Sequence, residues 1–144
     1  MAAKTILSAR LLVGLVLFVF GLNGFFHLIP FPPMSGSPAD FAGAMIAAGY
    51  LFPFVHATEV VAGALLLSGR FVPLALTVVA PVVLNILAFH LFLAPSGLPF
   101  PLIIAALEVF LAWGYRSAFR PLLRSNASAD AASESPALRS AKAV

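Results

Sequence analysis

The chain has 144 residues, of which 62% are hydrophobic and only 9% are charged, and this composition excludes an ordinary soluble globular domain. Its net charge of +3 comes from basic residues that are few and scattered, which excludes a nucleic-acid-binding surface. The absence of cysteine excludes a disulfide framework, a thiolate metal site and a Cys-x-x-Cys redox pair, so any redox role needs a borrowed cofactor.

The first predicted element is a membrane-spanning helix over residues 8–29. Residues 11–29 contain no Asp, Glu, Lys or Arg. At 1.5 Å per residue they extend about 28 Å, close to the thickness of the hydrocarbon core of a bilayer. A cleaved signal peptide is the alternative, since a basic start precedes the apolar stretch. That stretch is too long for a signal peptide, and no Ala-x-Ala cleavage site follows it directly.

A proline-rich loop over residues 30–36 leads to a short predicted helix over residues 38–48. Ser37 can cap its N-terminus, Pro38 suits its first turn, and Asp40 interacts favourably with the positive end of the helix dipole. Gly49 can end the helix. Because a helix this short cannot cross a bilayer, we expect it to lie at the membrane interface.

Three further spans are predicted over residues 52–68, 71–92 and 98–115. Pro81 is expected to kink the span that contains it. Residues 1–122 then form one all-α integral membrane domain, a bundle of four transmembrane helices with a short interfacial helix in the first outer loop. Residues 123–144 are rich in Ala and Ser with mixed charges and no apolar period, which predicts a disordered cytoplasmic tail.

The positions of the basic residues predict the orientation of the chain. All eight Lys and Arg lie near the N-terminus, in the connection between the second and third spans, or after the fourth span. They are Lys4, Arg10, Arg70, Arg116, Arg120, Arg124, Arg139 and Lys142. Four spans bring these three regions to one side of the membrane, and the positive-inside rule makes that side cytoplasmic. We therefore predict that both termini are cytoplasmic.

Several polar residues interrupt the apolar spans, and with this orientation all of them fall in the outer half of the membrane. They are Asn23, His27, His56, Glu59, Asn85, His90 and Glu108. An ionised carboxylate at such a depth costs several kcal/mol unless it is paired, so these side chains are expected to face the interior of the bundle. We interpret the group as a candidate polar pocket.

Spacing along the helices supports part of this pocket. Asn23 and His27 are four residues apart and share one helix face. His56 and Glu59 are three residues apart and also share a face. Each of these pairs can therefore point toward the same neighbouring helix.

Asn85 and His90 are five residues apart, about 140° around an ideal helix, so both can point inward only if the kink at Pro81 turns one of them.

The polar residues also have structural interpretations. The histidines can be interfacial residues in contact with water and headgroups. The asparagines can form hydrogen bonds between helices, and the glutamates can be neutral acids bonded to a neighbouring helix.

A metal site is a further alternative for the same residue types. His56-x-x-Glu59 together with Glu108 and other histidines contains the ligands of a carboxylate-bridged centre. Bundles that hold two metal ions usually carry two Glu-x-x-His repeats, whereas this chain has a single pair in reversed order. We predict no metal site. The sequence also lacks a phosphate-binding loop, a nucleophile elbow and a dinucleotide fingerprint.

Residues 9–15 and 20–27 are similar to the first helix of the DoxX family of membrane proteins. Residues 59–67, in which an acidic residue precedes small residues and leucines, resemble the second helix of that family. Asn85 and residues 112–116 also fit, so the resemblance covers about residues 8–122. It implies a four-helix protein of the bacterial inner membrane. Some members are linked to quinone-dependent sulfur oxidation and others to complexes that handle oxidative stress.

The sequence leaves enzymatic activity open and supports two main functional hypotheses. The first is a quinone-interacting or redox-associated subunit, to which a partner subunit supplies electrons and in which side chains exchange protons with the quinone. The residues assigned to that role are His27, His56, Glu59 and Glu108. The second is a non-enzymatic assembly or scaffold subunit, with a partner subunit or as a homo-oligomer, whose polar layer fixes helix packing. Proton-coupled transport is a third hypothesis, weakened by the apolar inner half of the spans.

Overall fold

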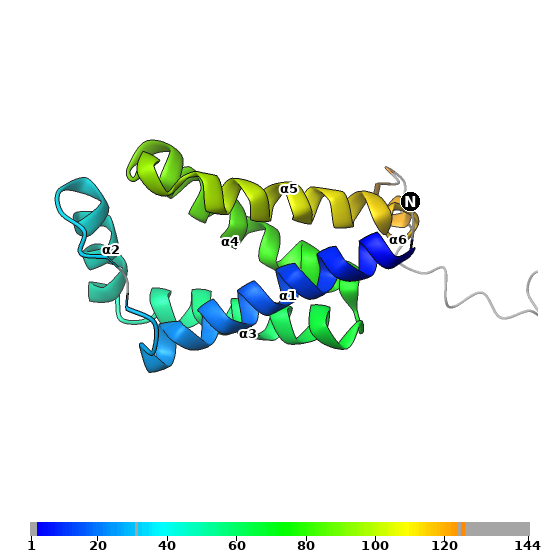
Figure 1. Ribbon diagram of the computed structural model, residues 1–144, viewed down its shortest axis with the longest axis horizontal. Helices are drawn as coiled ribbons and strands as arrows, with labels where there is room; N and C mark the ends of the chain where they lie inside the picture. Colours follow the sequence, from blue (N-terminus) through cyan, green and yellow to red (C-terminus); the bar gives the residue numbers. More distant parts are fainter. Residues whose placement is uncertain (1–2, 31, 124, 126–144) are drawn as a thin grey trace, which may run out of the picture.

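The computed structural model describes residues 3–30, 32–123 and 125, and within these ranges every regular element is helical. Three short helical segments are η1 (Pro95–Gly97), α6 (Arg116–Phe119) and η2 (Arg120–Leu123). The predicted all-helical class is therefore confirmed. Most of the tail that the sequence predicts to be disordered lies outside the described residues. The longer helices in Figure 1 are α1 (Ala3–Phe26), α2 (Ser37–Ala47), α3 (Leu51–Ser68), α4 (Val72–Phe92) and α5 (Pro99–Gly114).

The helices α1, α3 and α4 are long and apolar enough to cross a membrane. They have 24, 18 and 21 residues. At 1.5 Å per residue they extend about 27–36 Å, compared with about 30 Å of hydrocarbon in a bilayer. Their outer surfaces carry large exposed apolar side chains, among them Phe54, Val61 and Leu84. Such a surface is compatible with lipid, because apolar side chains that face hydrocarbon avoid the unfavourable free energy of exposure to water.

α5 is shorter than the other candidate spans. It has 16 residues, which extend about 24 Å. The chain then bends by 75° before the segment Arg116–Leu123, and the two parts form a fourth candidate span only when they are taken together. At this bend the Arg116 guanidinium lies 5.5 Å from the ring centroid of Trp113, in a cation–π contact. By length and composition the structure thus supports three to four spans, where the sequence predicts four.

α1 and α3 run side by side and share the most extensive helix interface (Figure 1). Glycine residues make this approach possible. A β-carbon built on Gly63 would lie 2.6 Å from the backbone nitrogen of Phe18 and 2.8 Å from the carbonyl oxygen of Gly14. One built on Gly21 would lie 2.8 Å from the backbone nitrogen of Val60. Small residues of this kind allow membrane helices to pack backbone against backbone, where van der Waals contact is the main attraction.

α4 packs against α3 and α5, and α5 also contacts α1. Buried apolar side chains from these helices form one continuous core and determine which face of each helix points inward. The core residues are Ala9, Val13, Leu17, Ala62, Leu66, Val72, Ala75, Leu76, Val79, Val83, Ile104 and Leu111.

α2 lies across the end of the molecule farthest from the N-terminus (Figure 1). Its bounds agree with the predicted helix over residues 38–48 to within one residue. Gly36 occupies the N-cap position, so Ser37 is the first helical residue and makes no capping bond, contrary to the expectation. α2 has no buried residue, and the ring of Phe41 lies 5.7 Å from the ring of Phe89 on α4. Its location at the membrane interface stays a prediction.

Candidate functional site

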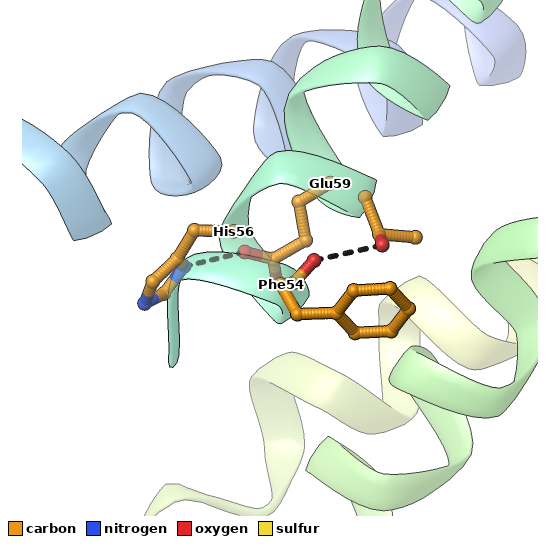
Figure 2. Close-up of polar contacts among 4 residues, drawn as sticks. Phe54, His56 and Glu59 are labelled. Carbon is orange, nitrogen blue, oxygen red and sulfur yellow. Dashed lines mark hydrogen bonds and ion pairs between the residues drawn. The ribbon is translucent and has the colours of Figure 1, made fainter. Parts of the chain in front are cut away.

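Two ionisable residues of α3 form a hydrogen-bonded pair. His56 and Glu59 lie one helical turn apart, and Figure 2 shows their side chains turned toward each other. The imidazole Nδ1 is 2.8 Å from Oε2 of Glu59. The two side chains are 16% and 7% exposed, so the pair is shielded from its surroundings. The shared helix face inferred from the spacing of these residues agrees with this contact.

α1 makes room for the imidazole at Gly24. A β-carbon at that position would overlap the ring of His56, so a larger residue would displace the ring. The rings of Phe25 on α1 and Phe52 on α3 lie beside it, with centroids 6.2 Å and 5.3 Å from that of the imidazole. The pair therefore occupies the interface between α1 and α3 with aromatic neighbours from both helices.

An imidazole bonded to a carboxylate is suited to exchanging a proton with a bound molecule. When Nδ1 donates its hydrogen to Glu59, the other ring nitrogen, Nε2, is available to a second partner. The carboxylate holds the ring in one orientation, as it does for histidines in many catalytic sites. With Nδ1 bonded to Glu59 in this way, the Nε2 atom of a neutral ring accepts a hydrogen bond from a ligand, and that of a protonated ring donates one to a ligand oxygen.

Asn23 is buried, but its side chain forms hydrogen bonds with the loop that follows α1. Its Nδ2 donates to the carbonyl oxygen of Ile29 at 3.0 Å, and the backbone nitrogen of Ile29 donates to its Oδ1 at 2.6 Å. His27 adopts a left-handed backbone conformation with φ of 53°, just after the helix ends at Phe26. The helical part of the predicted span over residues 8–29 is therefore three residues shorter at this end, because the Asn23 amide stabilises the turn. His27 is exposed.

Asn85 and His90 form no hydrogen bond with the pair of His56 and Glu59. Asn85 is exposed on the outer surface of α4, and its amide has no hydrogen-bond partner among the residues that the structure describes. His90 is half-buried, and its Nδ1 lies 2.8 Å from the carbonyl oxygen of Ile86 one turn earlier. Its ring packs edge-on against Phe89.

Glu108 lies on α5 at a different interface. It is 8% exposed and lines a cavity together with side chains of α4 such as Val83 and Leu84. Its Oε1 is buried and has no hydrogen-bond partner within the described part of the chain. Glu59 and Glu108, which the sequence assigns to one pocket, thus have different neighbours.

Of the seven predicted pocket residues, His56 and Glu59 are joined directly by a hydrogen bond. A single pocket that contains all seven stays a prediction.

The role of Gly24 was not predicted from the sequence, although a glycine directly after Asn23 inside an apolar helix indicates close packing. Within residues 3–30, 32–123 and 125, no group of three or more His, Asp or Glu side chains could hold a metal ion.

The apolar helices, their lipid-compatible surfaces and the shielded polar pair define an all-α membrane protein. The model of the DoxX family matches residues 5–92, which is more than half of the chain. The chain belongs to the DoxX family. The match includes all but the first two residues of α1, the whole of α2 to α4, and the pair formed by His56 and Glu59, whereas α5 and Glu108 lie outside it. No curated protein and no solved structure matches the chain.

Proposed function

We propose that this DoxX-family protein is a quinone-interacting, redox-associated subunit of the bacterial inner membrane, with the contact site at His56 and Glu59. The observation that carries the proposal is the shielded hydrogen bond of 2.8 Å between these two side chains. Gly24 leaves space for the imidazole, and the rings of Phe25 and Phe52 flank it. An apolar ring that carries carbonyl oxygens fits such surroundings, because aromatic side chains pack on the ring and the imidazole bonds an oxygen.

The chemistry assigned to this chain is proton exchange. Reduction of a quinone to a quinol adds two electrons and places one proton on each carbonyl oxygen. The Nε2 atom of His56 can hold or release a proton at such an oxygen, and the Glu59 carboxylate fixes the ring for this role. The electrons come from a partner subunit, because the chain has no cysteine with which to form a dithiol couple.

A quinone titration tests this assignment. Purified protein in lipid nanodiscs is titrated with decylubiquinone, and binding is compared in wild type and Glu59→Gln. The substitution removes the carboxylate that orients His56, so we expect affinity to fall about tenfold or more while the helical circular dichroism spectrum is unchanged. Glu108→Gln is the matched control and should bind as wild type does. Equal affinity in Glu59→Gln and wild type would overturn the assignment.

The proposed topology has four spans with both termini in the cytoplasm. It is supported by the described basic residues Lys4, Arg10, Arg70, Arg116 and Arg120, which four crossings bring to one side. Since the chain lacks cysteine, single cysteines can be labelled with a membrane-impermeant maleimide on intact spheroplasts. We expect labelling of Ser35→Cys and Ser96→Cys and protection of Ser68→Cys and Ser117→Cys. Labelling of Ser117→Cys would mean that α5 does not cross the membrane.

A non-enzymatic role in assembly is the second candidate, favoured by the exposed amide of Asn85. This residue lies 13 positions after the start of α4, about 20 Å along the helix, where lipid offers no hydrogen-bond partner. A second membrane helix can satisfy such an amide, a contact worth about 1 kcal/mol.

Association measured by energy transfer between labelled copies, and by co-purification of partner subunits, tests this role. Asn85→Leu should weaken association about fivefold without lowering the stability of the isolated chain, because no described residue bonds the amide. Val61→Leu, on the exposed surface of α3, serves as the control. Unchanged association in Asn85→Leu would exclude this amide as an assembly contact.

A further inference from the structure

A second buried acid lies in a cavity that the proposed quinone site does not use. The cavity has a volume of about 280 Å³, close to the lower end of the range for small-molecule sites. It lies between α4 and α5, and the ring of Phe119 on α6 also lines it. The described lining consists of Leu76, Thr77, Ala80, Val83, Leu84, Ala105, Glu108, Val109, Ala112 and Phe119.

Glu108 is the ionisable residue in the described lining, and its carboxyl group has no partner among the residues that the structure describes. Oε1 is buried without a hydrogen bond, and no described side chain or backbone group bonds the other oxygen. Thr77, the other polar side chain of the lining, already donates its hydroxyl hydrogen to the carbonyl oxygen of Pro73 at 2.9 Å. A buried polar group that lacks a partner costs free energy, so a ligand able to bond this carboxyl group gains that free energy on binding.

The cavity opens toward the outer surface of α4 and α5. Leu84 and Val109, which line it, are 64% and 70% exposed, so they lie at its mouth. Val83 on the inner wall is buried. In a membrane the exposed surface of these helices faces hydrocarbon. A molecule that enters through this mouth comes from the lipid phase and is itself apolar.

The chemistry of the carboxyl group selects the polar part of that molecule. The described lining holds no cation, and an isolated carboxylate in hydrocarbon is costly, so these surroundings favour the uncharged form of the group. An uncharged carboxyl group offers one O–H donor and one carbonyl acceptor. A hydroxyl group can serve both, whereas a quinone carbonyl can only accept.

We propose that this cavity binds an apolar molecule with a single hydroxyl group, an alcohol or a phenol, which forms hydrogen bonds with Glu108. The site is separate from the pair formed by His56 and Glu59 and does not depend on the proposed quinone role. The methyl groups of Ala80, Ala105 and Ala112 leave the space that the apolar part of the ligand fills.

Equilibrium dialysis of 1-naphthol against the full-length protein in lipid nanodiscs tests the proposal. The amount of 1-naphthol taken up by nanodiscs without protein is subtracted, because it partitions into the lipid. We expect saturable binding, weakened about tenfold in Glu108→Leu by the loss of the hydrogen bonds. Ala112→Leu, which fills the cavity one turn after Glu108, should also weaken binding. Glu59→Gln should bind as wild type does, which separates this site from the proposed quinone site.

The probe 1-methylnaphthalene, which has no hydrogen-bonding atom, distinguishes recognition by Glu108 from unspecific filling of an apolar space. It should bind wild type at least about tenfold more weakly than 1-naphthol does, with little change in Glu108→Leu. Equal binding of 1-naphthol to wild type and Glu108→Leu, or of both probes to wild type, would overturn the proposal. Absence of saturable binding to wild type would overturn it as well.

Discussion

Gly63→Leu is expected to prevent the native packing of α1 against α3 and to destabilise the protein by about 3 kcal/mol or more. A β-carbon at this position would come within 2.6 Å of the Phe18 nitrogen and 2.8 Å of the Gly14 oxygen. Both are backbone atoms of α1, so no side chain can rotate out of the way. The two helices would have to separate, and the largest helix interface of the molecule would be lost.

Unfolding by sodium dodecyl sulfate in mixed micelles, followed by circular dichroism, measures this effect. Gly43→Leu on α2 is the matched control, because a β-carbon there meets no atom within 4 Å. The control should unfold close to wild type, whereas Gly63→Leu should unfold at much lower detergent fraction or fail to accumulate. Equal stability of the two variants would contradict the close packing of α1 and α3.

The second large effect is expected from removing one partner of the pair between His56 and Glu59. His56→Leu leaves the Glu59 carboxyl group, 7% exposed, without its hydrogen bond and should cost about 3 kcal/mol. Replacing both residues by leucine removes the polar atoms together. The free energy of unfolding of this double variant should lie within about 1 kcal/mol of that of wild type. The coupling energy, which is the cost of the double variant minus the costs of both single variants, is therefore at least about 2 kcal/mol in magnitude, in the range of residues in direct contact.

The same detergent titration, applied to the two single variants and the double variant, gives this coupling energy. Thr58→Val is a control on the same helix. It removes an exposed hydrogen bond of 2.8 Å from the Thr58 hydroxyl to the carbonyl oxygen of Phe54. Because this bond is exposed, its loss should change the free energy of unfolding by no more than about 0.5 kcal/mol. Strictly additive costs of the two single variants would show that the pair does not form in the membrane.

Most helix positions were predictable because a bilayer requires long uncharged segments, which are visible in the sequence. The predicted spans over residues 52–68, 71–92 and 98–115 lie within about one residue of α3, α4 and α5. The end of α1 was predicted less well. Apolar residues continue to Ile29, yet Asn23 bonds the backbone of Ile29 and the helix stops at Phe26. Hydropathy contains no information about such a side-chain contact.

The candidate site was predictable only where it is local. His56 and Glu59 share one helix, so their spacing of three residues was enough to predict their proximity. The position of Glu108 depends on how α5 rotates against α4, and the sequence does not show that rotation. Asn85 was grouped with the pocket by depth alone, whereas packing of α4 turns it to the outer surface. Contacts between helices are thus the part that required a structure.

Native mass spectrometry of the protein, released gently from its own membrane, tests the proposed quinone contact most directly. We predict a retained mass that matches a quinone, lost in Glu59→Gln and kept in Glu108→Gln. The Glu108 control matters because it separates the contact at α3 from the cavity between α4 and α5. A protein that carries no added mass, or only phospholipid or a protein partner, would contradict the quinone site and favour a role in assembly.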